Sequence, residues 1–136
     1  DVKTLGTITE EAFREMKTGF RAPYLYDAAQ KLATGVISVE TLKGLNENET
    51  RDELISIKGV GEKVVNCVMF LSLGFREALP VDVWIKRIME SVYFNGEDTP
   101  KDQIQLFAKE QYGEYGGYAQ QYLFCFGREN KVGAKK

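Results

Sequence analysis

Apolar residues recur every three or four positions along most of the 136-residue chain, which is the spacing of one helix face. No stretch alternates apolar and polar residues with the period of two that marks a half-buried strand. The pattern therefore predicts an all-α fold. Helices are expected at 10–16, 23–33, 50–57, 62–73, 83–94, 101–112 and 118–126.

The residues between these segments are typical of helix caps and turns. Residues 7–10 have the form of a capping box, and Asp82 is placed to cap the helix that follows it. Thr99 is expected to cap the next helix, with Pro100 at its first position. Loops or single turns are expected at 38–42, 46–49, 58–61, 74–78 and 113–117, with a frayed basic tail at 131–136.

Composition is compatible with a folded domain, and charge gives no general attraction to nucleic acid. Hydrophobic residues make up 43% of the chain, enough for one domain with a single core. No apolar run would span a membrane, no signal peptide is visible, and a start at Asp1 indicates a trimmed or internal beginning. Because the net charge is −2, a DNA-binding function must rest on local features. Lys58, Lys86 and Arg87 are candidate phosphate contacts if side chains carry the binding.

Cysteine and histidine content excludes several kinds of site. Two cysteines, Cys67 and Cys125, are too few for a disulfide scaffold or for a four-cysteine metal or iron–sulfur site. The chain has no histidine, which excludes Ser–His triads and histidine-bound zinc. Two reduced thiols favour the cytoplasm as the default compartment.

The most informative stretch is the turn Gly59-Val60-Gly61 between two expected helices. Glycines permit positive φ angles and let another molecule approach the backbone closely. N–H groups at the start of the second helix can bind a phosphate without a lysine, and such dipoles do not appear in the net charge. A plain helix corner with glycines for packing is the alternative. The apolar residues at 54, 57, 60 and 64 around the turn favour binding of the DNA backbone.

Lys63 lies in the first turn of the second hairpin helix. The helix dipole and partial burial would both favour the neutral amine at this position. The neutral amine is the form that attacks carbon in Schiff-base chemistry, so Lys63 is a candidate nucleophile. A surface lysine that contacts a phosphate explains the position equally well on these grounds.

Asp82 is the candidate carboxylate. An N-cap aspartate accepts helix N–H bonds, which keep it ionised. Near Lys63, an ionised carboxylate would stabilise a developing sugar cation or take protons from the attacking amine. Taken alone, Pro80-Val81-Asp82 is better explained by a plain cap, but its combination with the hairpin and Lys63 favours a catalytic role.

Four segments, at 19–24, 59–67, 80–83 and 118–124, carry a resemblance to a known family. The second and third are similar to the hairpin with its lysine and to the aspartate segment of the 8-oxoguanine DNA glycosylases, within the helix–hairpin–helix glycosylase superfamily. The first is similar to the family segment that wedges into the duplex, and the last to the segment that lines the base pocket. Since the matches are spread over residues 19–124, the resemblance covers most of the chain.

The resemblance implies a role for each matched residue. It implies that Lys63 attacks C1′ of the damaged nucleotide, that Asp82 supports the transition state, and that the resulting imine allows β-elimination of the strand. Gln120 would hydrogen-bond the Watson–Crick edge of the base, with Phe124 and Cys67 stacked on its two faces.

The resemblance also implies contacts with the duplex and with a cation. Phe20 would act as the wedge and Arg21 would hold the orphaned cytosine, which helps to offset the few kcal/mol that base flipping costs. Main-chain carbonyls of Ile55, Ile57 and Val60 would hold a monovalent or divalent cation that bridges to a phosphate. No other cofactor is implied.

Several of these roles have a plainer alternative. By pattern alone, Phe124 is more often a core residue, and Cys67 is more often a small buried hydrophobe. Arg21 would equally be a solvated charge at a helix start, and Gln120 would simply face water.

The chain departs from the family in places. Lys58 stands where a proline is frequent, Trp84 replaces a common histidine, and Pro23 replaces a commoner arginine. The largest departure is length, because family members also carry an N-terminal β-rich domain and the first helices of the catalytic domain. Residues 1–127 are therefore expected to form a fragment, the C-terminal part of the catalytic domain, with the hairpin at about 50–73 and a basic tail at 128–136.

The expected partner is double-stranded DNA containing oxidised guanine, and the absent N-terminal part is a second expected partner. We expect a monomer with no membrane contact, located in the cytoplasm of a bacterium or archaeon or in the nucleus of a eukaryote.

Two other functions stay open. A related glycosylase with another base preference is one. Endonuclease III and the adenine glycosylase usually carry a four-cysteine cluster that this chain lacks, and the 3-methyladenine type normally lacks the lysine. A non-catalytic helix–hairpin–helix DNA-binding module is the other, and it would need neither Lys63 nor Asp82.

Overall fold

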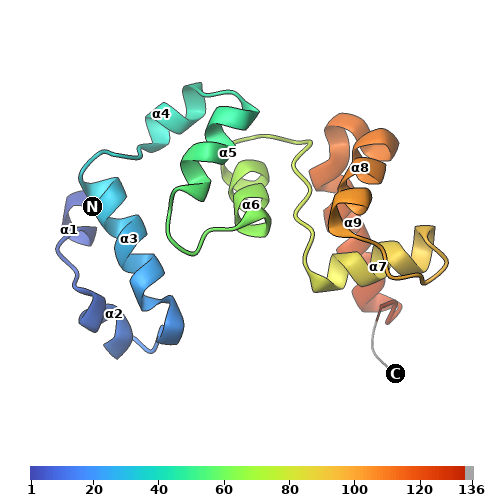
Figure 1. The fold of residues 1–136 in the computed structure, drawn as a ribbon, viewed down its shortest axis with the longest axis horizontal. Coiled ribbons are helices and arrows are strands. Elements are labelled where there is room, and N and C mark those ends of the chain that lie inside the picture. The colour runs from blue at the N-terminus through green and yellow to red at the C-terminus, as the bar shows by residue number, and fades with distance from the viewer. Residues whose placement is uncertain (134–136) are drawn as a thin grey trace. The chain divides into compact units, whose positions relative to one another are not determined.

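The computed structural model describes residues 1–133, and this part of the chain is helical with no strand. The all-α fold expected from the hydrophobic pattern is therefore confirmed for the described residues (Figure 1). In chain order the elements are α1 (Val2–Leu5), α2 (Glu10–Glu15), the 3-10 helix η1 (Gly19–Arg21), α3 (Ala22–Ala33), α4 (Val39–Gly44), α5 (Glu47–Ile55), α6 (Glu62–Ser72), α7 (Val83–Tyr93), α8 (Lys101–Tyr112), the 3-10 helix η2 (Gly113–Tyr115) and α9 (Gly116–Glu129). Between residues 1 and 133 no helix has the length and apolar composition needed to cross a bilayer.

The chain divides into two compact units, a division that the sequence did not predict. The first comprises Asp1–Val65 and the second begins at Asn66, so the boundary falls within α6. Each unit has a cluster of buried apolar side chains of its own.

In the first unit, α3 packs against α1 and α2 (Figure 1). Phe13 of α2 is buried with Ala22 and Ala29 of α3. A Cβ on Gly6 would overlap that of Ala33, so α1 and α3 can approach this closely only with glycine at that position. The Nε2 of Gln30 donates to the carbonyl of Gly6 at 2.7 Å and joins the same two helices.

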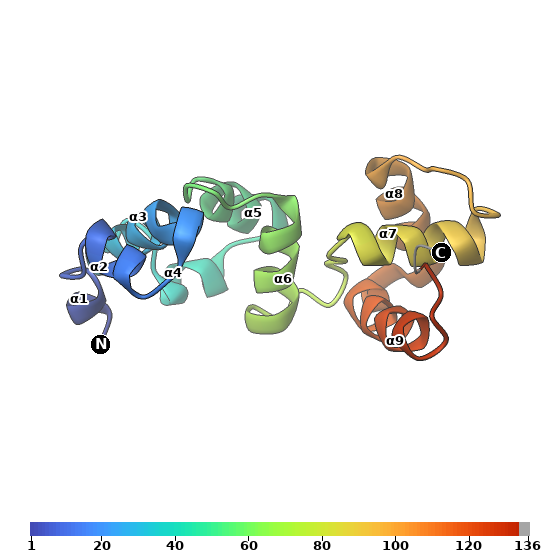
Figure 2. The same ribbon diagram turned by 90° about the horizontal axis from the view of Figure 1, so that it is seen from below.

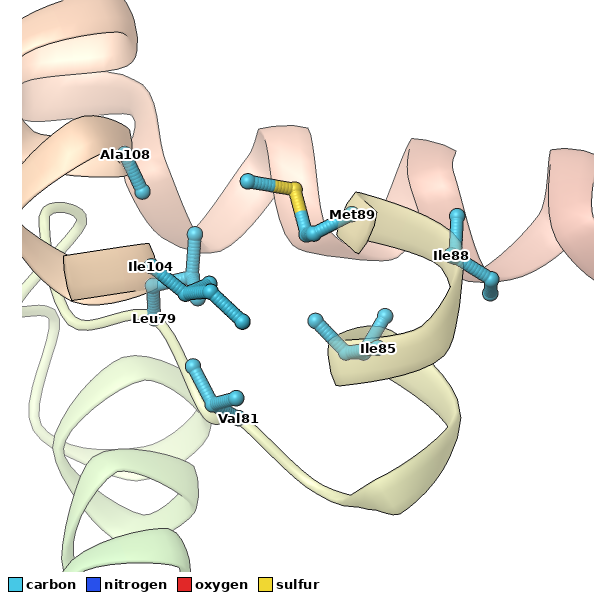
Figure 3. Close-up of a cluster of buried hydrophobic side chains, with 7 residues drawn as sticks. All are labelled: Leu79, Val81, Ile85, Ile88, Met89, Ile104 and Ala108. Atoms are coloured by element: carbon cyan, nitrogen blue, oxygen red, sulfur yellow. The ribbon is translucent and has the colours of Figure 1, made fainter. Parts of the chain in front are cut away.

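In the second unit, α7 supplies three core residues at helical spacing, and α9 packs closely against it. A Cβ on Gly127 would overlap the side chain of Ile88, which explains the glycine in the middle of α9. Figure 3 shows the buried cluster at the start of α7 and at α8, formed by Leu79, Val81, Ile85, Ile88, Met89, Ile104 and Ala108.

Helices α2 and α8 begin where expected, at Glu10 and Lys101, but their capping residues differ from those predicted. The N-cap of α2 is Thr9, which accepts a hydrogen bond from the N–H of Ala12 at 3.2 Å. The start of α8 is capped by Pro100 and not by Thr99. The hydroxyl of Thr99 instead donates to the carbonyl of Glu97 at 3.0 Å, so it is already engaged within the preceding loop.

Residues 46–49 start a helix, although their polarity predicted a loop. The Oδ1 of Asn46 accepts from the N–H of Glu49 at 3.1 Å, and the carboxylate of Glu49 accepts from the N–H of Asn46 at 3.0 Å. This reciprocal pair is a capping box, in which polar side chains satisfy the free N–H groups of a helix start. The helix therefore begins three residues earlier than predicted, at Glu47.

The glycines at 116 and 117 were expected to separate two helices, but they form the first turn of α9. A Cβ on Gly116 would lie 2.6 Å from the carbonyl oxygen of Glu77, and one on Gly117 would overlap the ring of Phe70. Close packing therefore explains these glycines.

The expected boundary between the catalytic part, residues 1–127, and the basic tail, residues 128–136, falls inside α9. The residues just after this helix are not frayed. Lys131 adopts a φ of 54°, and the N–H of Val132 donates to the carbonyl of Gly127 at 2.9 Å, as in a Schellman motif. Val132 also packs against the core of the second unit. The rest of the expected tail, residues 134–136, lies outside the described residues.

Candidate functional site

The turn from α5 to α6 has the form expected of a hairpin (Figure 2). The N–H of Val60 donates to the carbonyl of Ile57 at 3.0 Å and closes the turn. The first hydrogen bonds of α6 run from Val64 and Val65 to the carbonyl of Gly61, at 2.9 and 3.0 Å. The N–H groups of the residues before Val64 thus have no partner inside the helix, and they can bind an anion.

The two glycines of the turn have different roles. Gly59 has a φ of 78°, and a Cβ there would overlap the ring of Tyr24. Contacts within the protein therefore explain why residue 59 is a glycine, without any ligand. Apart from the glycine and its two chain neighbours, no described atom lies within 4 Å of the position of a Cβ on Gly61, so this glycine is open to another molecule. Of the two, Gly61 is the one whose missing side chain favours a ligand.

Helix α3 holds the turn through two charged residues that the sequence did not single out. The N–H of Lys58 donates to Oδ2 of Asp27 at 2.8 Å. The Nζ of Lys31 lies 3.0 Å from the same oxygen and also donates to the carbonyl of Ser56. The hydrogen bond from Lys58 and the nearby Lys31 ammonium hold the pKa of Asp27 below its usual range. The spacing of Asp27 and Lys31 on one helix face was the available signal, but it reads as an ordinary surface ion pair.

Lys63 lies in the first turn of α6, as expected, and its side chain is exposed. The partial burial considered for this position is not seen within the described residues. Its neighbour Glu62 pairs with Arg51 of α5 at 2.6 Å. The carboxylate next to Lys63 in the sequence is therefore already paired with a guanidinium.

Asp82 is the N-cap of α7, as predicted, and it is half-buried. Its Oδ1 accepts a hydrogen bond from the N–H of Ile85 at 2.8 Å. Asp82 belongs to the second unit and Lys63 to the first, so a shared cleft stays a prediction.

Gln120 and Phe124 lie one turn apart on α9. Gln120 is 7% exposed, which rules out the plain alternative that it faces water. Its Oε1 accepts from Nε2 of Gln121 at 2.6 Å. Phe124 is half-buried and packs against the core cluster, with the guanidinium of Arg128 5.9 Å from its ring centre. Phe124 therefore has a core contact as well as an accessible part.

Cys67 is a half-buried free thiol on α6. One turn further on, the ring of Phe70 meets that of Tyr118 edge-on, with centroids 5.2 Å apart, and packs on Gly117. Cys67 and Phe70 are three residues apart on α6, as are Gly117 and Gln120 on α9, and residues at this spacing share a helix face. The contact thus brings together the faces that carry two of the three expected base-pocket residues.

An open cavity of about 250 Å³ lies elsewhere in the second unit. Gln120 and Phe124 do not line it, so it is separate from the expected base pocket. Its lining is apolar and aromatic and consists of Tyr93, Tyr112, Ala119, Tyr122, Leu123 and Phe126.

Phe20 and Arg21 lie in η1, directly before α3. The ring of Phe20 is 68% exposed, as an inserting wedge requires. The guanidinium of Arg21 stacks over this ring at 4.5 Å from its centre, and the edge of Tyr24 meets the ring at a centroid distance of 6.5 Å. Arg21 is exposed, so both residues can reach a duplex.

Of the candidate phosphate contacts on α7, Lys86 is already engaged. Its Nζ contacts the carboxylates of Glu90 and Asp98, and these contacts raise the pKa of the amine. The expectation that Lys86 contacts phosphate is therefore not supported by its surroundings. The guanidinium of Arg87 lies 5.9 Å from the ring centre of the exposed Trp84.

The expected cation site consists of main-chain carbonyls of the hairpin. One of them, the carbonyl of Ile57, accepts the N–H of Val60. A carbonyl oxygen has two lone pairs, so this bond leaves room for a cation. Among residues 1–133, no cluster of three or more Cys, Asp or Glu side chains could hold a metal.

No protein-family model matches the chain, but individual proteins do. The probable N-glycosylase/DNA lyase of Methanothermobacter thermautotrophicus is 33% identical over 117 residues, which cover 86% of this chain and 37% of that protein. The chain thus spans less than half the length of this relative.

Solved structures share the fold. The 8-oxoguanine glycosylase/lyase of Clostridium acetobutylicum, in complex with double-stranded DNA containing cytosine opposite 8-oxoG, matches 97% of this chain and 45% of that chain at 40% identity, with a TM-score of 0.89. The 3-methyladenine DNA glycosylase of Archaeoglobus fulgidus matches 94% of this chain and 43% of that chain at 25% identity, with a TM-score of 0.72.

Proposed function

We propose that this chain, which belongs to the 8-oxoguanine DNA glycosylase/lyase family, supplies the nucleophile and the DNA-binding hairpin of a base-excision repair enzyme that removes oxidised guanine. The observation that carries the proposal is the position of Lys63. It lies in the first turn of α6, directly after a hairpin turn whose free N–H groups suit a phosphate. Nucleophile and DNA contact are thus only a few residues apart.

Lys63 is proposed to act as the amine nucleophile. Its neutral Nζ attacks C1′ of the damaged nucleotide, and the bond from C1′ to the base breaks with its electron pair leaving on the base, which takes up a proton. Loss of a proton from nitrogen and opening of the sugar ring give an imine. Removal of a proton from C2′ then lets the C3′–oxygen bond break, with the phosphate as leaving group. Because Lys63 is exposed, bound DNA is proposed to exclude water from the reacting atoms.

Asp82 is proposed to stabilise the positive charge that develops on the sugar. The hydrogen bond from Ile85 fixes one carboxylate oxygen, so the carboxylate is held in one orientation. A pre-oriented negative charge stabilises a developing cation without reorganisation during the reaction.

Five residues are proposed to recognise the damaged nucleotide and the opposite strand. The buried Gln120 is held through its Oε1 by Gln121, which leaves its amide hydrogens for the base edge. Phe124 and Cys67 would stack on the base, and the exposed Phe20 and Arg21 would fill the duplex and hold the cytosine. Aromatic faces and hydrogen bonds to the Watson–Crick edge are the usual means of reading a flipped base.

The carbonyls of Ile55, Ile57 and Val60 are proposed to hold a cation that bridges to a phosphate. Carbonyl oxygens are suitable ligands for hard cations. Affinity for duplex DNA should then be higher in potassium or magnesium chloride than in a choline salt of equal ionic strength. Equal affinity in all three salts would contradict the site.

The proposed partner is double-stranded DNA bound by a monomer, in the compartment that holds the genome. The match covers only 45% of the Clostridium chain. We therefore propose that full activity requires this chain to be joined to the region that its relatives carry beyond the match.

Borohydride trapping tests the function. The chain is incubated with duplex DNA containing 8-oxoguanine opposite cytosine, both alone and fused to the remaining region of the Clostridium enzyme. Reduction of the imine should give a covalent protein–DNA adduct in at least the fusion. Lys63→Gln should abolish the adduct, while Lys58→Gln, a matched change in the same hairpin, should retain it. An adduct that persists in Lys63→Gln would disprove the nucleophile assignment.

The same assay separates the two alternatives. A glycosylase with another base preference would form the Lys63-dependent adduct on a duplex with a different lesion but not on 8-oxoguanine. A non-catalytic module would bind the duplex through the hairpin and form no adduct on any lesion.

A further inference from the structure

The α3 support, defined here as Tyr24, Asp27 and Lys31, lies on one face of α3 at helical spacing. Each member contacts the hairpin turn. The ring of Tyr24 occupies the space where a Cβ of Gly59 would be, so ring and backbone are in close contact. Asp27 accepts the N–H of Lys58 at 2.8 Å. One helix face therefore holds successive residues of the turn.

Lys31 completes this support at the start of the turn. Its Nζ contacts the carbonyl of Ser56, and it pairs with Asp27 at 3.0 Å. The α3 support thus places a ring against Gly59, accepts from a backbone donor at Lys58 and donates to a backbone acceptor at Ser56. Groups that hold both donors and acceptors of a turn fix its conformation more strongly than apolar packing alone.

The same helix connects to Phe20 at its N-terminal end. Phe20 meets Tyr24 edge-to-face at 77°, and Arg21 stacks on Phe20 at 4.5 Å. A continuous series of contacts therefore runs from Arg21 through Phe20 and Tyr24 to Gly59. All of these residues belong to the first unit.

We propose that Tyr24 and Asp27 are positioning residues that join Phe20 to the hairpin, so that insertion into the duplex and binding of the phosphate occur as one event. The proposal rests on the proposed function, which makes Phe20 and the hairpin DNA contacts. A fixed distance between two DNA contacts lowers the cost of ordering them when they bind. Without the α3 support, each contact would form independently.

A double-mutant cycle measures this coupling. Phe20→Ala removes the ring, and Gly61→Ala places a methyl group in the space open to the phosphate. Two quantities are recorded: affinity for duplex DNA, and base flipping from the fluorescence of 2-aminopurine beside an abasic site. If the contacts are coupled, the loss in the double variant should differ from the product of the single losses by about threefold or more.

The cycle is then repeated in backgrounds that alter the α3 support. In the Tyr24→Leu and Asp27→Ala backgrounds, the loss of affinity in the double variant should equal the product of the losses caused by Phe20→Ala and Gly61→Ala. Tyr24→Phe keeps the ring and Asp27→Asn keeps an acceptor for Lys58, so both should preserve the coupling. Tyr26→Leu is the matched control, because residue 26 projects from the opposite side of α3 and should leave the coupling unchanged.

Local order gives a second readout. The amide of Lys58 should exchange with solvent faster in Asp27→Ala than in Asp27→Asn, while circular dichroism reports that both variants remain helical. A merely structural role would weaken stability without removing the coupling. Independent losses in the unaltered protein, or coupling that survives Tyr24→Leu and Asp27→Ala, would overturn the proposal. If neither Phe20→Ala nor Gly61→Ala weakens DNA binding, the two DNA contacts on which this proposal rests are wrong, whereas the borohydride adduct at Lys63 tests the proposed function separately.

Discussion

The Oδ1 of Asp82 accepts a hydrogen bond from the backbone N–H of Ile85 at 2.8 Å, so the carboxylate proposed for catalysis also closes the first turn of α7. Ile85 in turn is fully buried in the core of the second unit. The orientation of Asp82 is thus fixed by a residue that cannot move without disturbing the core. The catalytic and the structural role of this carboxylate can be separated by substitution.

We predict that Asp82→Asn retains the fold and loses the chemistry. Asparagine caps a helix about as well as aspartate, so the free energy of unfolding should change little. Asp82→Ala should also lose the cap and be destabilised by about 0.5–2 kcal/mol. Urea unfolding measures the change in stability of both variants, and single-turnover excision measures the loss of chemistry. If Asp82→Asn excises the base at the normal rate, the catalytic role is wrong.

The two hairpin glycines should respond differently to alanine. Gly61→Ala meets no protein atom and should change stability by no more than about 0.5 kcal/mol. Its methyl group obstructs the phosphate, and losing a charge-assisted hydrogen bond of about 1.5–3 kcal/mol corresponds to a loss of roughly tenfold or more in affinity.

Gly59→Ala should instead unfold the hairpin. Its φ of 78° and the ring of Tyr24 both oppose a side chain, and the φ alone costs about 1–2 kcal/mol. Urea midpoints and DNA titrations of the two variants make the comparison. Full affinity in Gly61→Ala would show that DNA does not approach this side of the turn.

Gln120→Leu should reduce lesion recognition and leave strand cleavage at a preformed abasic site intact. Leucine fills a similar volume but offers no hydrogen bond to the base, and the abasic substrate has no base to read. Excision of 8-oxoguanine should therefore fall while the borohydride adduct with abasic DNA is retained. Equal loss on both substrates would assign Gln120 a structural role within α9.

The salt dependence of DNA affinity should be modest, because helix N–H groups and not lysines are proposed to bind the phosphates. Lys86→Met should leave the slope of log affinity against log salt unchanged, since its ammonium already contacts Glu90 and Asp98. Arg87→Met should lower the slope by about 1 if the guanidinium beside Trp84 contacts a phosphate. A slope that falls in Lys86→Met would show that the ion pairs open on binding.

The sequence predicted those features that short-range rules determine. The bounds of α8, the cap at Asp82 and the hairpin turn all follow from local spacing and cap chemistry. The α3 support was missed because its contacts join residues 31 positions apart, as between Asp27 and Lys58, and no local rule pairs them. Gly59 was interpreted as open to DNA for the same reason, since the ring of Tyr24 fills that space only in the folded unit.

Acid should weaken the contact between Asp27 and the hairpin. The N–H of Lys58 and the Lys31 ammonium hold the pKa of Asp27 below its usual range, so the folded state binds the proton less well than the unfolded state. The stabilisation is therefore present above the ordinary carboxyl pKa near 4 and is lost as the pH falls through the lower folded value. The difference in stability between the unaltered protein and Asp27→Asn should be largest at neutral pH and should shrink below about pH 4. Urea midpoints at a series of pH values measure it, and a difference that stays constant with pH would show that Asp27 stabilises the hairpin without its charge.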